Sequence, residues 1–400
     1  MSIRISTSSM FQGGLSQLLA RQAQVVQTQN QLATGRRVVN GADDPLAAGA
    51  AVALDRGIAE LARYGLNASV LQNRLNLQES ALTEAGDALQ RLRELGVQAA
   101  NATLTSSDRV SLSKEVEQIR ERLLGLANGT DSGGRYLFAG SQDDRKPFVD
   151  SPAGVSYQGD QVQRRVEVAP ELAVADAEPG SEAWMRVPTG VGALAATAGA
   201  GNTGSALLGT YSLLDATAFG GQDYTVVFTG PGTYDIEDAG GTVLSSGTYT
   251  PGQTLSFNGV SMKLDGVPAA GDTFAIGPSR SRDVFATVQA FIDALQAPAI
   301  TPVERTRQVN ALGSLLADLS AAGDHLIDKR AGGGARLAAI DDAAELRAAQ
   351  DITLRETLSG LRDVNVAEAA SRLAQQSTAL EAAQASFVRL QGLSLFNYLR

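Results

Sequence analysis

Few residues in the sequence form patterns that could support chemistry. Gly199, Gly201 and Gly204 match the glycine spacing of a dinucleotide-binding loop, which requires a strand before the loop and a helix after it. An alanine- and glycine-rich run precedes these glycines, and β-type residues follow them. The spacing therefore predicts a flexible linker and no cofactor site.

The single histidine and one acidic cluster are the other candidates. His325 falls between two predicted helical stretches, and a lone histidine without a serine or cysteine nucleophile motif supports neither a histidine-based zinc site nor a catalytic triad. We expect it on the surface of a helix. Asp235, Glu237 and Asp238 could ligate calcium, but they do not fit the twelve-residue calcium loop and favour a solvated turn between strands.

Composition excludes further chemistry. The chain has no cysteine, which removes disulfides, thiolate metal sites and cysteine nucleophiles. It has no phosphate-binding Gly-Lys loop, and the Asn-x-Ser/Thr matches at Asn67, Asn101 and Asn128 lie in or beside predicted helices. The sequence therefore predicts no enzyme, no cofactor and no catalytic, cofactor-binding or metal-binding residue.

Length and charge limit the partners. The 400 residues allow two or three domains. The 33 basic and 43 acidic side chains give a net charge of −10, which disfavours nucleic acid and anionic membranes as partners. No stretch approaches eighteen apolar residues, and the first residues lack the apolar core of a cleavable signal peptide. We therefore expect no membrane span and no export by the general secretory route.

The two chain ends share one pattern. Apolar residues and glutamines recur there in steps of three and four, which is typical of coiled-coil helices. Because the large apolar groups are few, each end should fold poorly alone, and we predict that the two pair antiparallel and leave apolar surface for neighbouring copies. The predicted assembly seams are Phe11, Leu15, Leu18, Val25 and Leu32 at the first end, and Val366, Leu373, Leu380, Phe387 and Leu390 at the second.

Inside these ends the sequence predicts a helical bundle. Asp44 and Pro45 form a helix start, and the apolar rhythm then continues to about Asn101. A loop with Ser106, Ser107 and Asp108 is expected to restart a helix, and further amphipathic stretches are expected at 284–295, 309–319 and 337–344.

The middle of the chain changes to short β-type runs separated by glycine and proline. Residues 151–280 hold thirteen acidic and five basic side chains, so most of the negative charge lies there and indicates an outward-facing surface. We predict an α+β fold: an elongated helical bundle with paired N- and C-terminal coiled-coil helices, β-hairpins and an inserted all-β outer domain. The expected domains are a terminal segment (1–44 and 361–400), a bundle core (45–187 and 281–360) and the outer domain (188–280).

Several local motifs together resemble a known family. Thr34-Gly-Arg-Arg-Val-Val-Asn40, followed by Asp43-Asp-Pro-Leu-Ala47, is similar to the flagellin superfamily. The Asp-Asp-Pro version and Gly134-Arg-Tyr-Leu-Phe-Ala-Gly140 resemble its hook-filament junction branch, the third hook-associated protein. Leu361-Arg-Asp-Val-Asn-Val-Ala-Glu368 and Leu393-Ser-Leu-Phe-Asn-Tyr398 complete the likeness.

This resemblance implies a structural subunit of the bacterial flagellum at the junction between hook and filament. It implies an extracellular location reached through the flagellar type III apparatus, with a dedicated export chaperone on the C-terminal coil. It also implies contacts with the first hook-associated protein, flagellin and copies of itself. Two alternatives stay open: flagellin itself, and an adhesin that acts through the β domain.

One further match concerns recognition by other organisms. Arg91, Leu95 and Glu115 correspond to positions that in flagellin contribute to recognition by an innate immune receptor. The competing interpretation, which we favour, is that they make contacts between neighbouring subunits.

Overall fold

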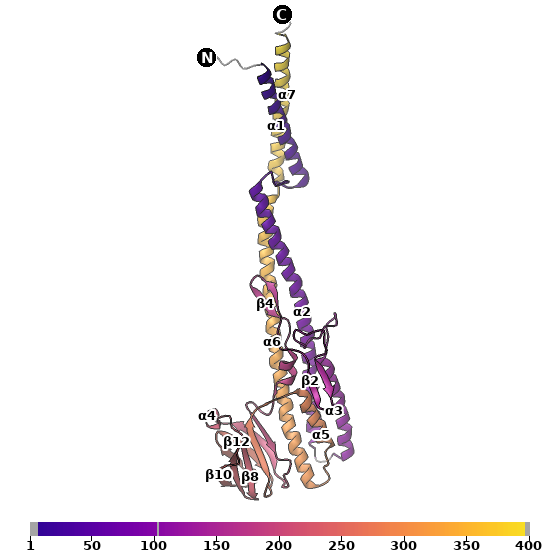
Figure 1. Cartoon of the computed structure of the whole chain (residues 1–400), viewed down its shortest axis with the longest axis vertical. Coiled ribbons are helices and arrows are strands. Elements are labelled where there is room, and N and C mark those ends of the chain that lie inside the picture. Colours follow the sequence, from indigo (N-terminus) through magenta and orange to yellow (C-terminus); the bar gives the residue numbers. More distant parts are fainter. Residues whose placement is uncertain (1–6, 102–103, 397–400) are drawn as a thin grey trace. The chain divides into compact units, whose positions relative to one another are not determined.

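The computed structural model describes residues 7–101 and 104–396, and within these ranges the side chains of Ser9 and of residues 11–389. Long helices and short antiparallel strands make up the fold, as Figure 1 shows, and the predicted α+β class is confirmed. The helices are α1 (Thr7–Thr34), α2 (Pro45–Ala99), α3 (Ser106–Ala127), α4 (Ala216–Phe219), α5 (Val284–Gln296), α6 (Pro302–Arg362) and α7 (Val366–Phe396), with a short π-helix, η1 (Ser181–Met185).

The strands form five small antiparallel sheets. Their bounds are β1 (Phe148–Ser151), β2 (Gly154–Tyr157), β3 (Arg165–Ala169), β4 (Leu172–Ala175), β5 (Val187–Pro188), β6 (Leu194–Ala198), β7 (Leu207–Leu213), β8 (Tyr224–Gly230), β9 (Thr233–Asp238), β10 (Val243–Thr248), β11 (Thr254–Phe257), β12 (Val260–Asp265), β13 (Thr273–Pro278) and β14 (Ser281–Arg282). Pairs β1–β2, β3–β4 and β5–β14 stand alone. The larger sheets have the orders β10-β9-β8-β13-β6 and β11-β12-β7.

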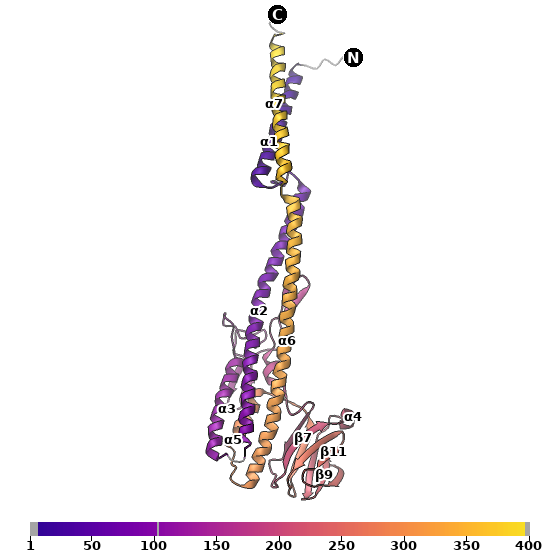
Figure 2. The ribbon, with the colours of Figure 1, turned by 180° about the vertical axis from the view of Figure 1, so that it is seen from behind.

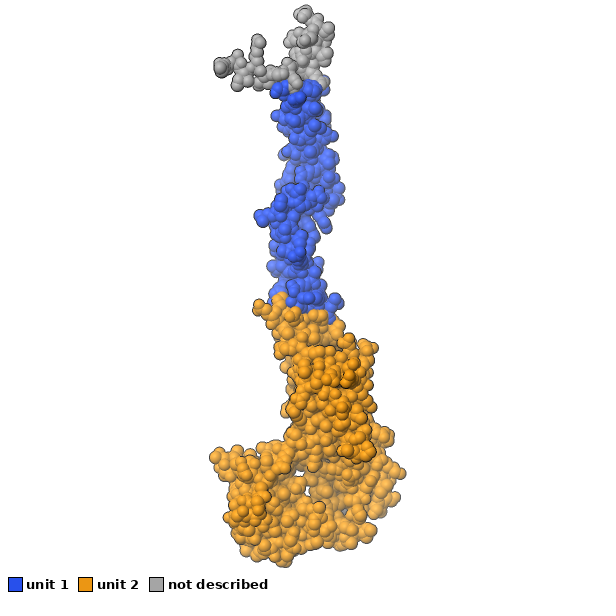
Figure 3. All heavy atoms as spheres, viewed as in Figure 1, with its two compact units in different colours: residues 1–66, 343–400 blue, residues 67–342 orange. Residues whose placement is uncertain are grey.

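The chain divides into two compact units, which Figure 3 colours separately. Unit 1 comprises residues 1–66 and 343–400, and unit 2 comprises residues 67–342. The long helices α2 and α6 each contribute to both units. The domain boundaries expected from the sequence stay predictions.

Local signals in the sequence explain where the helices of unit 2 begin. Thr105 caps α3 by accepting a hydrogen bond from the Asp108 amide, and the Asp108 carboxylate accepts one from the Thr105 amide in return. The side chain and main chain of Thr105 hold the pKa of Asp108 below its usual value. Asp283 caps α5 through the Ala286 amide, and Thr301 and Glu304 form a second capping box at the start of α6.

The main core of unit 2 lies between α2, α3, α5 and α6. Figure 2 shows α3 and α5 beside the lower half of α2. Large side chains from the loops and hairpins complete the core: Trp184 of η1 is stacked on Phe285, with ring centroids 6.1 Å apart, and lies edge-on to Phe138. At Gly96 a Cβ atom would lie 2.6 Å from Leu316, so glycine permits α2 and α6 to approach closely.

One prediction about the helices is wrong. The stretches expected at 309–319 and 337–344 belong to the single helix α6, which continues through Gly332, Gly333 and Gly334. Three glycines cost helix stability in isolation, but tertiary contacts on both sides offset that cost. Arg330 is 2.7 Å from Glu79, Arg336 is 2.6 Å from Glu178, and Leu326 and Ile340 are buried. His325 therefore lies within a helix and not between two.

A second core holds the inserted β domain of unit 2. Side chains alternate between buried and partly exposed along β8 and β12, and the buried faces of both larger sheets meet in one cluster that includes Val226, Phe228, Met262 and Phe274. The glycines at 199, 201 and 204 lie in the ordered loop between β6 and β7. The buried Asp272 carboxylate accepts hydrogen bonds from the amides of Thr203 and Gly204, so this segment is not the flexible linker expected from its composition.

The helical core of unit 2 generates a stability prediction. Leu92→Ala should lower the free energy of unfolding by about 2–5 kcal/mol, because Leu92 is fully buried and its loss leaves a cavity. Val97→Ala on the same helix should change it by less than about 0.5 kcal/mol, because Val97 is exposed. Urea unfolding followed by the fluorescence of Trp184, the one tryptophan of the chain, measures both. Equal losses in the two variants would contradict this packing.

Candidate functional site

The two terminal helices of unit 1 form an antiparallel pair. Phe11 of α1 lies against Phe387 of α7, with ring centroids 5.0 Å apart, and the Thr28 hydroxyl is 2.8 Å from the Gln376 side-chain oxygen. As the residue number increases along α1, the number of the contacting residue on α7 decreases. A Cβ atom at Gly14 would lie 3.0 Å from the Phe387 ring, so the absence of a side chain at Gly14 leaves room for this ring to pack against α1.

The pair buries little of its own apolar surface. Of the predicted seam residues, Val25 is buried, whereas Leu18, Leu32, Leu373, Leu380 and Phe387 are half-buried. Phe11, Leu15 and Val366 keep 45%, 43% and 61% of their surface exposed. The side chain of Leu390 lies outside the described residues. These seam assignments stay predictions of assembly contacts, and the pairing of α1 with α7 leaves apolar surface free for them.

Sequence reasoning missed a second apolar stripe on the same helices. Leu19 and Val26 of α1 and Val388 of α7 are 58%, 46% and 64% exposed. Leu19 and Val26 are seven residues apart and so lie on one face of α1. The signal was present in the doublets Leu18-Leu19 and Val25-Val26, because adjacent helical residues point in different directions and only one of each doublet can face α7.

A compact hydrogen-bonded loop connects the terminal pair to the rest of unit 1. We call residues 34–45 and 361–365 the terminal clasp. Gly35, which has a φ of +68°, accepts a hydrogen bond from the Val364 amide, and the Arg37 amide donates to the Arg362 carbonyl at 2.7 Å. Arg36 and Asp363 form a β-bridge. These main-chain bonds fix the start of the chain against a segment more than three hundred residues later.

The side chain of Arg37 is central to the clasp. Its guanidinium donates to the Leu361 carbonyl at 2.7 Å and to the Asp44 carboxylate at 3.2 Å. The Gln31 side chain in turn donates to the Arg37 carbonyl at 2.7 Å. Arg37 therefore links the end of α1, the start of α2 and the end of α6. A planar, permanently charged guanidinium with several donors suits this role better than an ammonium group does.

The Asp-Asp-Pro motif builds the other half of the clasp. The Asp43 carboxylate accepts hydrogen bonds from the amides of Val39 and Asn40, and so closes the loop. Asp44 caps α2 through the Ala47 amide, which together with Arg37 lowers the pKa of Asp44. Pro45 occupies the first turn, where its missing amide proton costs nothing. The motif therefore has a structural role: it closes the loop and starts α2.

The residues matched to receptor recognition separate in the structure. Arg91 of α2 donates to Glu115 of α3 at 2.9 Å and to Glu94 at 3.0 Å, and both Arg91 and Glu115 are about half exposed. Leu95 is fully buried in the core of unit 2. A receptor that meets the folded subunit would reach Arg91 and Glu115 but not Leu95. Whether these residues serve recognition or subunit contacts stays a prediction.

The remaining chemical candidates have structural partners. His325 is half-buried on α6, and its Nε2 lies 2.8 Å from the Glu182 carbonyl. Asp235, Glu237 and Asp238 lie on β9, and the Asp238 carboxylate accepts the amides of Gly240 and Thr242 in the turn to β10. Within residues 7–101 and 104–396, no group of three or more histidine, cysteine or acidic residues is arranged to hold a metal ion. In that same part of the chain, no helix combines the length and the apolarity that a membrane span requires.

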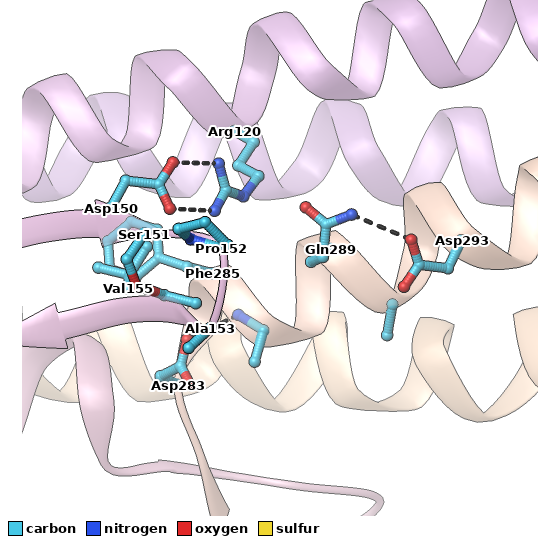
Figure 4. Close-up of a pocket in the computed structure, with 13 residues that line it drawn as sticks. Arg120, Asp150, Ser151, Pro152, Ala153, Val155, Asp283, Phe285, Gln289 and Asp293 are labelled. Carbon is cyan, nitrogen blue, oxygen red and sulfur yellow. Dashed lines mark hydrogen bonds and ion pairs between the residues drawn. The ribbon is translucent and has the colours of Figure 1, made fainter.

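An open groove of about 900 Å³ lies in unit 2 between the β1–β2 hairpin, α3 and α5, as Figure 4 shows. Arg120 and Asp150 face each other across it in a bidentate ion pair with both contacts at 2.8 Å. The hydrogen bond from Arg120 lowers the pKa of Asp150. Gln289 donates to Asp293 nearby. This charge pairing holds the hairpin on the helices and offers no nucleophile paired with a base.

The comparisons with known proteins agree with one another. The family model of the bacterial flagellin N-terminal helical region matches residues 5–143. The crystal structure of Xanthomonas campestris FlgL is 44% identical, covers 76% of this chain and 99% of its own, and has a TM-score of 0.72. The flagellar hook-associated protein 3 structure of Legionella pneumophila is 30% identical, with coverages of 77% and 98% and a TM-score of 0.73.

A curated relative extends the same result. Flagellar hook-associated protein 3 of Salmonella typhimurium is 36% identical over 172 residues, which are 43% of this chain and 54% of that protein. The chain thus spans about half the length of this curated relative.

The clasp generates the second prediction. Arg37→Ala should raise amide hydrogen exchange at Arg37 and Val364 by about fivefold to tenfold, because it removes the charged hydrogen bonds that hold both strands of the clasp. Arg36→Ala is the matched control: it retains the main-chain bridge, and the Arg36 side chain makes no ion pair with a described residue. Hydrogen exchange with mass spectrometry measures both variants. Equal exchange in the two would remove Arg37 from its central role.

Proposed function

The chain belongs to the family of flagellar hook-associated protein 3, a structural component of the bacterial flagellum, and we propose that it forms the junction between hook and filament. In this role it provides the platform on which flagellin assembles. The observation that supports the proposal best is the terminal pair of α1 and α7, in which Phe11, Leu15 and Leu19 stay exposed. Exposed apolar side chains at regular helical spacing are the surface that a shared layer of helices would bury.

The same observation supports different roles for the two units. Unit 2 has two well-filled cores, whereas the described part of unit 1 buries few large side chains, among them Val25, Leu61, Tyr64 and Leu358. A segment that cannot satisfy its apolar surface alone becomes ordered when a partner covers it. We propose that neighbouring copies, the first hook-associated protein and flagellin supply this cover after assembly.

The small number of buried side chains in the terminal segment also favours export. A terminal segment with little burial of its own unfolds at low cost, as passage through the narrow flagellar type III apparatus requires. We propose that an export chaperone covers α7 before secretion and that the assembled protein is extracellular. The proposed role is structural: it involves no catalysis, nucleic acid or membrane surface.

The function can be tested in a motile strain from which this chain has been removed. Returning a chain that ends at residue 380 should yield hooks without filaments and flagellin free in the medium, because the lost residues include Phe387 and the exposed Val388. Trp184 fluorescence of the purified variant should stay as in the intact chain, since its surroundings lie in unit 2. Electron microscopy and analysis of the medium provide the readout. Normal filaments would refute the junction role.

Removal of the outer β domain is the matched control and separates the junction role from an adhesin. Thr189 and Arg280 are joined by main-chain and side-chain hydrogen bonds, so residues 191–278 can be replaced by a short glycine linker between Gly190 and Ser279. The junction role predicts that filaments still form on this variant. If the domain acted as an adhesin, the variant without it would lose surface binding. Filaments would then also form in the strain from which the whole chain has been removed.

A further inference from the structure

We propose that Asn40 is a site of spontaneous deamidation in the folded protein. The sequence contains three Asn-Gly pairs: Asn40-Gly41, Asn128-Gly129 and Asn258-Gly259. Asparagine before glycine is chemically labile because glycine has no side chain to obstruct attack on the neighbouring amide. The three pairs share the same covalent structure, so differences between them must come from the fold.

The reaction has two steps. The main-chain nitrogen of the glycine attacks the side-chain amide carbon of the asparagine, a C–N bond forms, and the side-chain nitrogen leaves as ammonia with the proton that the main-chain nitrogen gives up. Water then adds to one of the two imide carbonyls and breaks one C–N bond. The product is an aspartyl or an isoaspartyl group. Water is the single co-reactant, and no oxidant or reductant is needed.

At Asn40 the reacting groups are free. The residue is exposed, and neither its side-chain amide nor the Gly41 nitrogen makes a hydrogen bond with a described residue. The bonds that do form use the Asn40 main chain: its amide donates to Asp43, and its carbonyl accepts from the Asp43 amide. No atom lies within 4 Å of a Cβ position at Gly41. Rotation of the side chain onto the Gly41 nitrogen therefore breaks no hydrogen bond between this side chain and a described residue.

At Asn128 both reacting groups are held. The side chain donates to the carbonyls of Leu124 and Phe148 and accepts from the Phe148 amide, all within 3.0 Å. The Gly129 nitrogen donates to the Leu126 carbonyl at 3.0 Å. Attack at this site requires the loss of these bonds and the opening of the connection between α3 and β1.

At Asn258 the main chain is held. Asn258 and Gly259 form the turn between β11 and β12 with φ angles of +41° and +76°. The Gly259 carbonyl accepts the amides of Leu214 and Asp215, and a Cβ atom at Gly259 would collide with Asp215. The turn cannot rotate into the geometry of attack without loss of the strand pairing around it. The fold therefore leaves one of the three pairs reactive.

Conversion at position 40 changes the terminal clasp. It places a new carboxylate on a residue whose main-chain amide donates to the Asp43 carboxylate, and the isoaspartyl product also adds a methylene to the main chain of the loop. We expect repulsion between the new carboxylate and Asp43 to weaken the hydrogen bonds that Asp43 accepts from residues 39 and 40. We expect faster amide exchange across residues 36–44 in the converted chain. This inference concerns the chemistry of the chain and does not depend on the proposed junction role.

The test uses the purified full-length chain in mildly alkaline buffer, with peptide mapping by mass spectrometry and enzymatic detection of isoaspartate. In the folded protein Asn40 should convert at least about tenfold faster than Asn128, because the latter must first lose several hydrogen bonds. Asn258 should also be slower than Asn40. In concentrated urea the three sites should react at similar rates, which shows that the fold causes the difference.

The matched variant is Gly41→Ala. Gly41 has open space at its Cβ position and does not adopt a positive φ, so the chain should fold unchanged while conversion at Asn40 slows several-fold. Comparable rates at the three sites in the folded chain, or no change with Gly41→Ala, would overturn the proposal. Conversion at Asn40 without faster exchange across residues 36–44 would overturn the expected effect on the clasp.

Discussion

The terminal clasp, which joins the two ends of the chain, depends on a small set of hydrogen bonds to the main chain. Arg37 reaches the Leu361 carbonyl with its side chain and the Arg362 carbonyl with its amide, so segments from opposite ends of the sequence are fixed at one point. Without this point, α1 would be tied to α7 by few buried side chains. A local polar clasp thus adds to the few large side chains that the described part of unit 1 buries. Polar bonds at a surface give orientation more than stability, because water competes for them.

This distribution of stability fits a protein that must be both unfolded and assembled. The cores of unit 2 retain their fold through many large buried side chains, whereas the terminal pair retains an exposed stripe with Leu19, Val26 and Val388. A longer or better-packed terminal coil would hide the stripe within the monomer and remove the reason to associate. The modest packing of α1 on α7 is therefore consistent with a surface that binds other subunits.

Much of the fold followed from local sequence signals, because those signals act over a few residues. Asp44 and Pro45 lie where α2 begins, Ser106 to Asp108 lie where α3 begins, and period-two patterns lie where the outer strands form. The continuity of α6 could not be read in this way. Gly332, Gly333 and Gly334 signal a break locally, and the ion pairs from Arg330 and Arg336 that outweigh them come from partners far away in sequence.

The site shows the same limit. The heptad positions of α1 and α7 were visible as a pattern, but the pattern could not tell Val25, which is buried, from Phe11, which stays exposed. Likewise Arg91 and Leu95 are one turn apart on α2 and look equivalent in sequence, yet one pairs with Glu115 at the surface and the other lies in the core. Periodicity gives the direction of a side chain relative to its helix. The fold decides which face of a helix packs against a neighbouring element. A face that no such element covers is where another subunit can bind.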